Sequence, residues 1–124
     1  MNAADYDIVE NDDGVPYIER GANFVFTARW KDSEGALVNL AGYTARMQVR
    51  QSVDAPTILL DLTTENGGIV LGGADGTVQL VQTAEQTAAL TWTRGVYDIE
   101  LVRGDGYVTR FMQGAIATYK EVTR

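Results

Sequence analysis

Three stretches of the chain alternate between apolar and polar residues with a period of two, which is typical of β-strands with one buried face. In residues 22–30 the rings of Phe24 and Phe26 fall on one side and polar residues fall on the other. Residues 43–50 and 96–102 repeat the pattern. The predicted core consists of the apolar sides of these and neighbouring strands: Phe24, Phe26, Trp30, Tyr43, Met47, Val49, Leu60, Leu80, Tyr97, Ile99 and Leu101.

Shorter apolar runs between turn residues predict further strands. They cover residues 15–19, 57–62, 69–71, 77–81, 107–112 and 114–122. Asn66-Gly67-Gly68 has strong turn chemistry. Residues 83–90 are the one helical candidate, because Thr83 and Gln86 have capping-box spacing and the alanines favour a helix. About seven to nine short strands at near-regular spacing predict an all-β, two-sheet antiparallel β-sandwich with one short connecting helix.

The first residues lack this alternation. Residues 1–14 are polar and acidic apart from Tyr6, Ile8 and Val9, so we interpret them as an acidic N-terminal arm with one short extended piece. Residues 15–124 are then a single β-sandwich domain, which is long enough to bury a core.

The composition limits the classes of partner. The formal net charge is -7, which argues against binding nucleic acid through phosphates or docking on an anionic membrane. Residues 1–7 contain neither a basic region nor an apolar run, so we expect no signal peptide there. No apolar segment approaches the length of a transmembrane helix.

The residue types also limit the chemistry. The chain has no histidine and no cysteine, which excludes histidine-based nucleophilic sites and thiolate metal sites. We therefore expect no catalytic activity, no cofactor and no tightly bound metal. Asp98 and Glu100 share one face of a predicted strand and could form a carboxylate pair of the kind that glycosidases use. Outward carboxylates on sandwich strands are usually just solvated, and we favour that interpretation.

Three other features could indicate a binding site but can also be explained by the fold or by solvation alone. Arg103-Gly104-Asp105 is a tripeptide that some integrins recognise, but with Gly106 it also suits a hairpin turn. Residues 11–14 could meet calcium, although they lack the spaced ligands of a calcium loop. Trp92 either covers the core or lies exposed as a contact anchor.

The run Gly35-Ala-Leu-Val-Asn-Leu-Ala-Gly-Tyr-Thr-Ala-Arg-Met-Gln-Val-Arg50 resembles a known family. It is similar to the small immunoglobulin-like β-domains of tailed-phage tails, and the nearest named family is the N-terminal domain of phage upper baseplate proteins. Five further segments match the same domains in the same order: residues 17–24, 75–80, 87–90, 96–102 and 114–124. The baseplate proteins continue into long fibrous or receptor-binding parts, whereas this sequence ends at Arg124, so a separate adaptor or decoration subunit is expected.

This resemblance implies an immunoglobulin-like sandwich with a structural, non-enzymatic role in a tailed-bacteriophage virion. The implied protein is a tail or baseplate adaptor that attaches a tail fibre or receptor-binding protein. It would be made in the host bacterial cytoplasm, and its partners would be other tail or fibre proteins and copies of itself in a symmetric assembly. We expect Tyr6, Ile8 and Val9 to order against a neighbouring chain, with Tyr17 and Ile18 continuing the contact or entering the sheet.

Two alternatives stay open. A cell-surface carbohydrate-binding module would need exposed aromatic rings, for which Trp92, Tyr107 and Tyr119 are the candidates. A capsid decoration protein belongs to the same structural class, and the sequence does not separate it from a tail adaptor.

Overall fold

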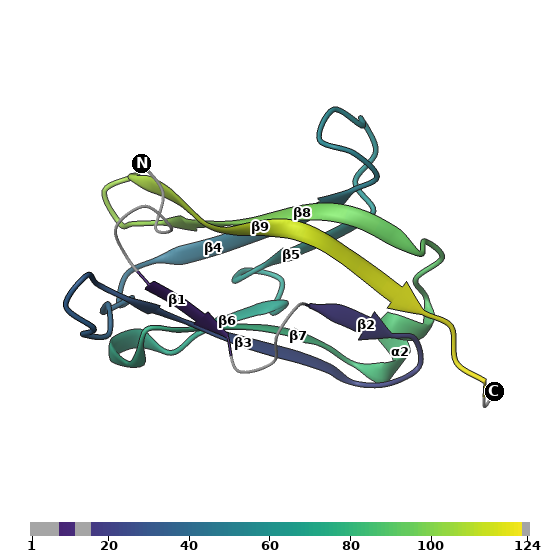
Figure 1. Cartoon of the computed structure of the whole chain (residues 1–124), viewed down its shortest axis with the longest axis horizontal. Coiled ribbons are helices and arrows are strands. Elements are labelled where there is room, and N and C mark those ends of the chain that lie inside the picture. Colours follow the sequence, from purple (N-terminus) through teal and green to yellow (C-terminus); the bar gives the residue numbers. More distant parts are fainter. Residues whose placement is uncertain (1–7, 12–15, 123–124) are drawn as a thin grey trace.

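A computed structural model describes residues 8–11 and 16–122, and in this part of the chain nine strands form two sheets that pack face to face (Figure 1). The strands are β1 (Ile8–Asn11), β2 (Tyr17–Glu19), β3 (Phe24–Lys31), β4 (Thr44–Arg50), β5 (Leu60–Thr63), β6 (Ile69–Leu71), β7 (Thr77–Gln82), β8 (Arg94–Val102) and β9 (Val108–Tyr119). One sheet has the order β1-β3-β7-β6 and the other has the order β2-β9-β8-β4-β5. The predicted immunoglobulin-like β-sandwich is therefore confirmed.

The first two strands belong to different sheets. β1 pairs antiparallel with β3, and Ile8 lies opposite Lys31. β2 pairs with β9 in parallel, which is an exception to the antiparallel prediction. Residues 8–11 are thus an edge strand of the sandwich, although they belong to the segment 1–14 that was predicted as an arm with one short extended piece.

The core lies between the sheets and follows the predicted alternation. β3 alternates buried and more exposed residues along its length, because its inner side chains meet the other sheet. Of the predicted core residues, Tyr43 and Leu60 are only half-buried against the core, and the rest are buried. Trp30 packs against both Phe111 and Tyr43, with ring centroids 6.0 Å and 6.2 Å apart.

The end of the chain differs from the prediction. Residues 107–112 and 114–122 were expected to form two strands, but β9 is continuous from Val108 to Tyr119. Its register against β8 shifts at a bulge, because Ile99 pairs with Met112 while Glu100 pairs with Arg110. The predicted strand at residues 57–62 also begins later, at Leu60.

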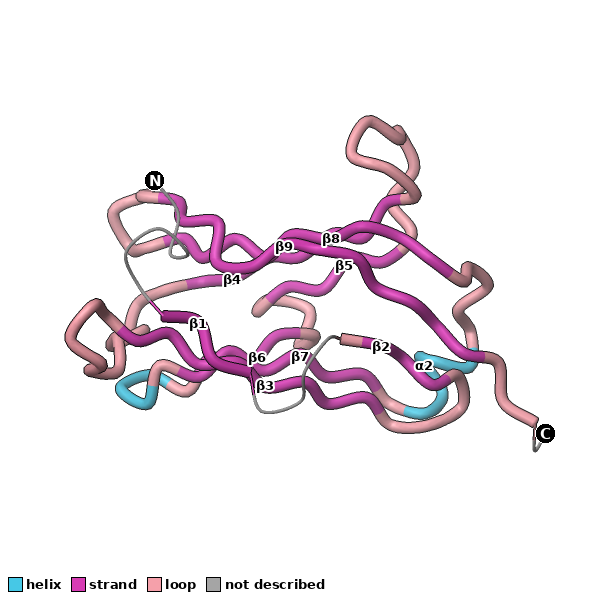
Figure 2. Tube along the Cα trace, viewed as in Figure 1, coloured by secondary structure: helices cyan, strands magenta, loops and turns pink. Residues whose placement is uncertain are grey.

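Short helices close two of the connections (Figure 2). The helix α2 (Ala84–Ala88) has the predicted capping box, in which the Gln86 amide N–H donates to Thr83 Oγ1 at 3.1 Å and the Thr83 amide N–H donates to Gln86 Oε1 at 2.9 Å. A 3-10 turn, η1 (Gly73–Asp75), precedes β7. Neither helix in the described residues is long and apolar enough to span a membrane.

Candidate functional site

The outer face of the five-stranded sheet carries a row of polar and charged side chains next to a hollow. We use "outer face" for the side chains of β4, β8 and β9 that point away from the core. They alternate with buried neighbours, so the regular strand period places them together. The outer face includes Arg46, Gln48, Arg50, Val96, Asp98, Glu100, Arg110 and Gln113.

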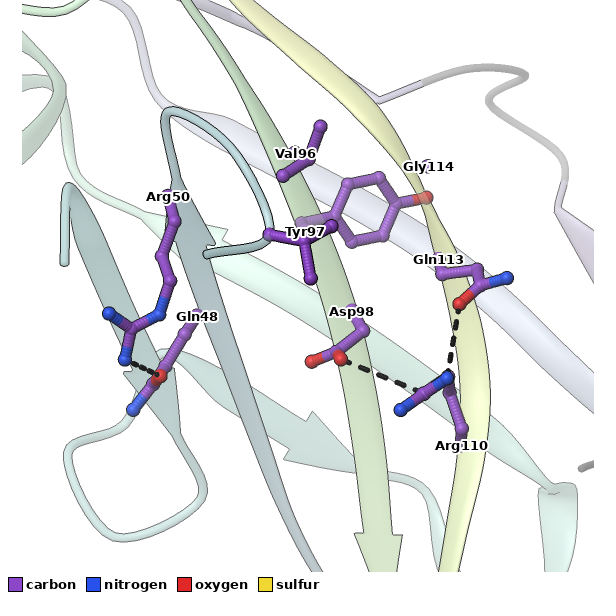
Figure 3. A pocket seen from close by; sticks show the side chains of 9 residues that line it. Gln48, Arg50, Val96, Tyr97, Asp98, Arg110, Gln113 and Gly114 are labelled. Carbon is purple, nitrogen blue, oxygen red and sulfur yellow. Dashed lines mark hydrogen bonds and ion pairs between the residues drawn. The ribbon is translucent and has the colours of Figure 1, made fainter. Parts of the chain in front are cut away.

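A hollow of about 550 Å³ lies on this face (Figure 3). Its lining comes from β4, β8, β9 and the loop that joins β4 to β5, which rises above the sheet (Figure 1). Val53 in this loop is 82% exposed and lines the hollow. Arg50 fixes the loop, because its guanidinium donates to the Ala55 carbonyl at 2.8 Å and to Gln48 Oε1 at 2.9 Å.

Charged side chains of both signs alternate beside the hollow. Arg110 Nε lies 3.6 Å from Asp98 Oδ2, and a second Arg110 nitrogen donates to Gln113 Oε1 at 3.4 Å (Figure 3). Arg46 Nε donates to Glu100 Oε1 at 2.8 Å. Exposed ion pairs of this kind contribute at most about 1 kcal/mol to stability, so these charges add little to the stability of the fold.

These ion pairs bear on the possible carboxylate pair. Asp98 and Glu100 share the outer face of β8, as predicted. Each is paired with a separate arginine, and neither is buried. This geometry agrees with the interpretation of two solvated carboxylates and offers no positioned acid and base for glycoside hydrolysis.

The floor of the hollow is a tyrosine that packs across the strand. Tyr97 is 6% exposed, and burial raises the pKa of its phenol. Gly114 lies opposite Tyr97 on β9, and a Cβ added there would be in ordinary van der Waals contact with the ring, at 3.5 Å (Figure 3). The phenol therefore stays neutral and can donate a hydrogen bond.

The predicted partner-binding residues do not form one surface. Tyr6 lies outside the described residues. Ile8 and Val9 belong to β1, whose backbone pairs with β3 of the same chain. Tyr17 is 50% exposed and its ring meets Tyr119 edge-on, with centroids 5.8 Å apart. Ile18 is fully buried, so the partner contact predicted as one alternative for it does not hold and the other, entry into the sheet, does: the inward side of β2 belongs to the core.

The predicted sugar-binding rings are also dispersed. Tyr107 precedes β9 and Tyr119 ends it, and a strand of that length separates its ends by more than about 30 Å. Trp92 packs against the core and is partly buried, with an indole N–H that has no hydrogen-bond partner among the described residues. No common stacking platform results from these three rings.

The Arg103-Gly104-Asp105 turn is closed on itself. The Arg103 guanidinium donates two hydrogen bonds to the Asp105 carboxylate, at 2.9 Å and 2.8 Å, and lies 4.8 Å from the centroid of the Tyr107 ring. These bonds lower the pKa of Asp105 to about 2, and they raise that of Arg103. Both charged groups are satisfied inside the turn, which favours a hairpin role over display to a receptor.

Sequence reasoning did not single out Arg50, Val53 or Arg110 as a site. The polar positions of the alternating strands were the only sequence feature that could have pointed to these residues. Such positions identify an exposed face of the sheet but do not show where that face forms a hollow. Val53 carried no signal beyond its place in a predicted loop.

Comparisons with known proteins concern the fold. No family model matches the chain, and no curated protein matches it. One similar chain comes from a structure titled "Structural basis of T cell specificity and activation by the bacterial superantigen toxic shock syndrome toxin-1". It is 9% identical to the present protein, and the match covers 91% of the present protein and 99% of the other chain, with a TM-score of 0.51. The Lin-41 filamin domain is 12% identical over 91% of each chain, with a TM-score of 0.46. At such identities a likeness concerns the fold alone.

Proposed function

We propose that the chain is a non-enzymatic structural protein of a tailed-bacteriophage virion, a tail or baseplate adaptor that attaches a tail fibre or receptor-binding protein. One observation carries the proposal. The run of residues 35–50 that resembles phage-tail domains forms the turn before β4 and β4 itself, and its polar residues Arg46, Gln48 and Arg50 supply one side of the outer face. The segment behind the resemblance thus contributes both to the core and to the candidate contact surface.

The physical character of the outer face supports a protein partner. A typical protein interface surrounds a few desolvated anchors with a polar rim. Val53 is the exposed anchor candidate, and the arginines and carboxylates around the hollow form the rim. Because symmetric particles repeat each contact, weak individual contacts are enough for stable incorporation.

The first test is mass spectrometry of purified virions, in which the protein is expected at a fixed stoichiometry to other tail proteins. Its absence from virions would refute the proposal. Its location on the capsid in a density map would replace the adaptor with a decoration protein.

The second test compares two matched variants. Val53→Asp places a charge at the outer face, and Val122→Asp places the same charge at a residue that is 93% exposed beyond the end of β9 and does not line the hollow. We expect Val53→Asp to lower incorporation at least about tenfold, as for the loss of an interface anchor, while Val122→Asp assembles normally. Normal incorporation of Val53→Asp would exclude the outer face as the contact.

The N-terminal arm needs a shorter deletion than the sequence suggested. Removing residues 1–14 would also remove β1 and uncover the edge of β3. Removing residues 1–7 alone keeps β1 and tests whether the preceding segment orders against a neighbouring chain. We expect this shorter form to fold and to lose incorporation, and normal assembly would show that the segment has no such role.

A further inference from the structure

The strand register orders the lining of the hollow on the outer face. Gln48, Asp98 and Gln113 lie opposite one another on β4, β8 and β9, so they form one row across the three strands. Arg50 lies on one side of this row and Arg110 on the other, and all five residues line the hollow (Figure 3). A segment that lies across the row can therefore reach both guanidinium groups.

The two glutamines of the row present N–H donors. Gln48 Oε1 accepts from Arg50 at 2.9 Å, and Gln113 Oε1 accepts from Arg110 at 3.4 Å. A side-chain amide whose oxygen is engaged in this way offers its NH2 group to other partners. Neither NH2 group has a hydrogen-bond partner among the described residues, so the row has donors in excess.

Arg50 adds a positive charge that the described part of the chain does not compensate. Its guanidinium donates to the Ala55 carbonyl and to Gln48 Oε1, which are both neutral, and it has further N–H donors beyond these two bonds. No ion pair among the described residues involves Arg50, whereas Arg110 Nε lies 3.6 Å from Asp98 Oδ2. The lining thus combines two arginines with one carboxylate, although the whole chain carries a net charge of -7.

We propose that this hollow binds a carboxylate side chain presented by an extended, acidic segment of a partner protein. Arg50 supplies the counter-charge, and the NH2 groups of Gln48 and Gln113 donate to carboxylate oxygens or to backbone carbonyls of the segment. Hydrogen bonds between a guanidinium and a carboxylate are among the strong ones in proteins. The inference rests on the proposed role of the outer face as the contact surface, and it names the chemistry of the partner.

Two other ligands fit this lining less well. A neutral saccharide would need an exposed ring to stack on, and the one ring in the lining, Tyr97, is 6% exposed. A nucleic acid would bring a long row of phosphates toward a chain of net charge -7, and a single uncompensated arginine does not offset that repulsion. A protein segment can place a carboxylate at the hollow without such a row of charges.

The test uses the full chain and acetylated, amidated Thr-X-Val-X-Thr peptides in which X is glutamate, glutamine or lysine. In an extended peptide both X side chains share one face, so both can point at the sheet. Calorimetry is expected to give saturable binding of the glutamate peptide, weakened by added salt, and at least about tenfold weaker binding of the other two peptides. Absence of saturable binding, equal binding of the glutamine peptide, or binding of a single-stranded oligonucleotide or a neutral oligosaccharide in its place would overturn the proposal.

Three variants assign the residues. Arg50→Gln removes the uncompensated charge and should weaken binding of the glutamate peptide about tenfold. Because this variant also frees the loop from its bond at Ala55, Asp98→Asn separates charge from loop structure: it removes the one carboxylate of the lining and should strengthen binding about threefold. Lys120→Gln removes one positive charge at an exposed position beyond the end of β9 and should change binding less than about twofold. Unchanged or weaker binding in Asp98→Asn would refute the site.

The peptide measurement does not depend on the virion. If the protein is present in virions but binds none of the peptides, the acidic partner is overturned and the adaptor role stands. If the protein is absent from virions but binds the glutamate peptide, the adaptor role is overturned and the acidic ligand stands.

Discussion

The hydroxyl of Thr87 is predicted to hold α2 against the corner between β2 and β3. Thr87 is fully buried, and its Oγ1 accepts from the Gly21 amide at 3.0 Å while donating toward the Ala22 carbonyl at 2.8 Å. The same hydroxyl lies 3.1 Å from the Ala84 carbonyl within the helix. Thr87→Val keeps the shape of the side chain and removes these hydrogen bonds.

The size of the effect follows from the partners that are lost. Two neutral hydrogen bonds at about 1 kcal/mol each give a loss of about 2 kcal/mol. Gly21 and Ala22 are half-buried, so water can partly replace the lost hydrogen bonds, and the destabilisation should not rise far above about 2 kcal/mol. Thr87→Ser keeps the hydroxyl and loses one buried methyl group, which should cost about 0.8 kcal/mol.

Calorimetric or fluorescence melting would measure both variants, with Thr44→Val at an exposed position of β4 as the control. A domain of this size loses about 4 °C for each kcal/mol, so Thr87→Val should melt about 8 °C lower, Thr87→Ser about 3 °C lower, and the control within about 2 °C of the parent. If Thr87→Ser were the more damaging variant, the methyl contact rather than the hydroxyl would hold the corner, and the argument would fail.

Three further predictions test the core, a sheet edge and the β8–β9 turn. Ile99→Ala should cost about 2–5 kcal/mol in urea unfolding, because Ile99 is 1% exposed, whereas Val70→Ala, at 49% exposed, should cost about 0.5 kcal/mol. The Asn66 side chain covers the edge strand β5, because it donates to the Asp61 carbonyl at 3.0 Å and accepts from the Thr63 amide at 2.9 Å. Asn66→Ala would leave these backbone groups of the edge open to another chain, so sedimentation experiments should show concentration-dependent association, which a purely local role of Asn66 would not cause. The bonds to Arg103 lower the pKa of Asp105 from 3.8 to about 2, so they should stabilise the turn above pH 4 and be lost as the pH falls through about 2. An NMR titration of Asp105 should have its midpoint near 2, and a midpoint near 4 would contradict the prediction.

The period-two pattern was sufficient to predict most of the fold. The alternation in β3, β4 and β8 predicted the correct strands and inner faces. A strand with one solvent-exposed face needs polar residues at every second position, so the sequence shows which side is buried. The capping box before α2 was predicted for a similar reason, since both of its hydrogen bonds join residues three apart.

The sequence could not give the features that depend on residues far apart in the chain. The pairing of β1 with β3 was missed because the choice between a free arm and an edge strand depends on the partner strand. The sequence left open whether Ile18 contacts a partner or enters the sheet, because a three-residue strand is too short to show which side is buried. The uncompensated charge of Arg50 is invisible in a sequence, since it depends on which groups the fold brings near the guanidinium.

The bulge in β9 shapes the candidate site. In a regular strand, residues three apart point to opposite faces. Because Phe111 is the extra residue between the pairs of Ile99 and Glu100, Arg110 and Gln113 come to the same outer face and form a hydrogen bond there (Figure 3). Bulges commonly redirect side chains at functional surfaces, and this one places Arg110 and Gln113 together in the wall of the hollow.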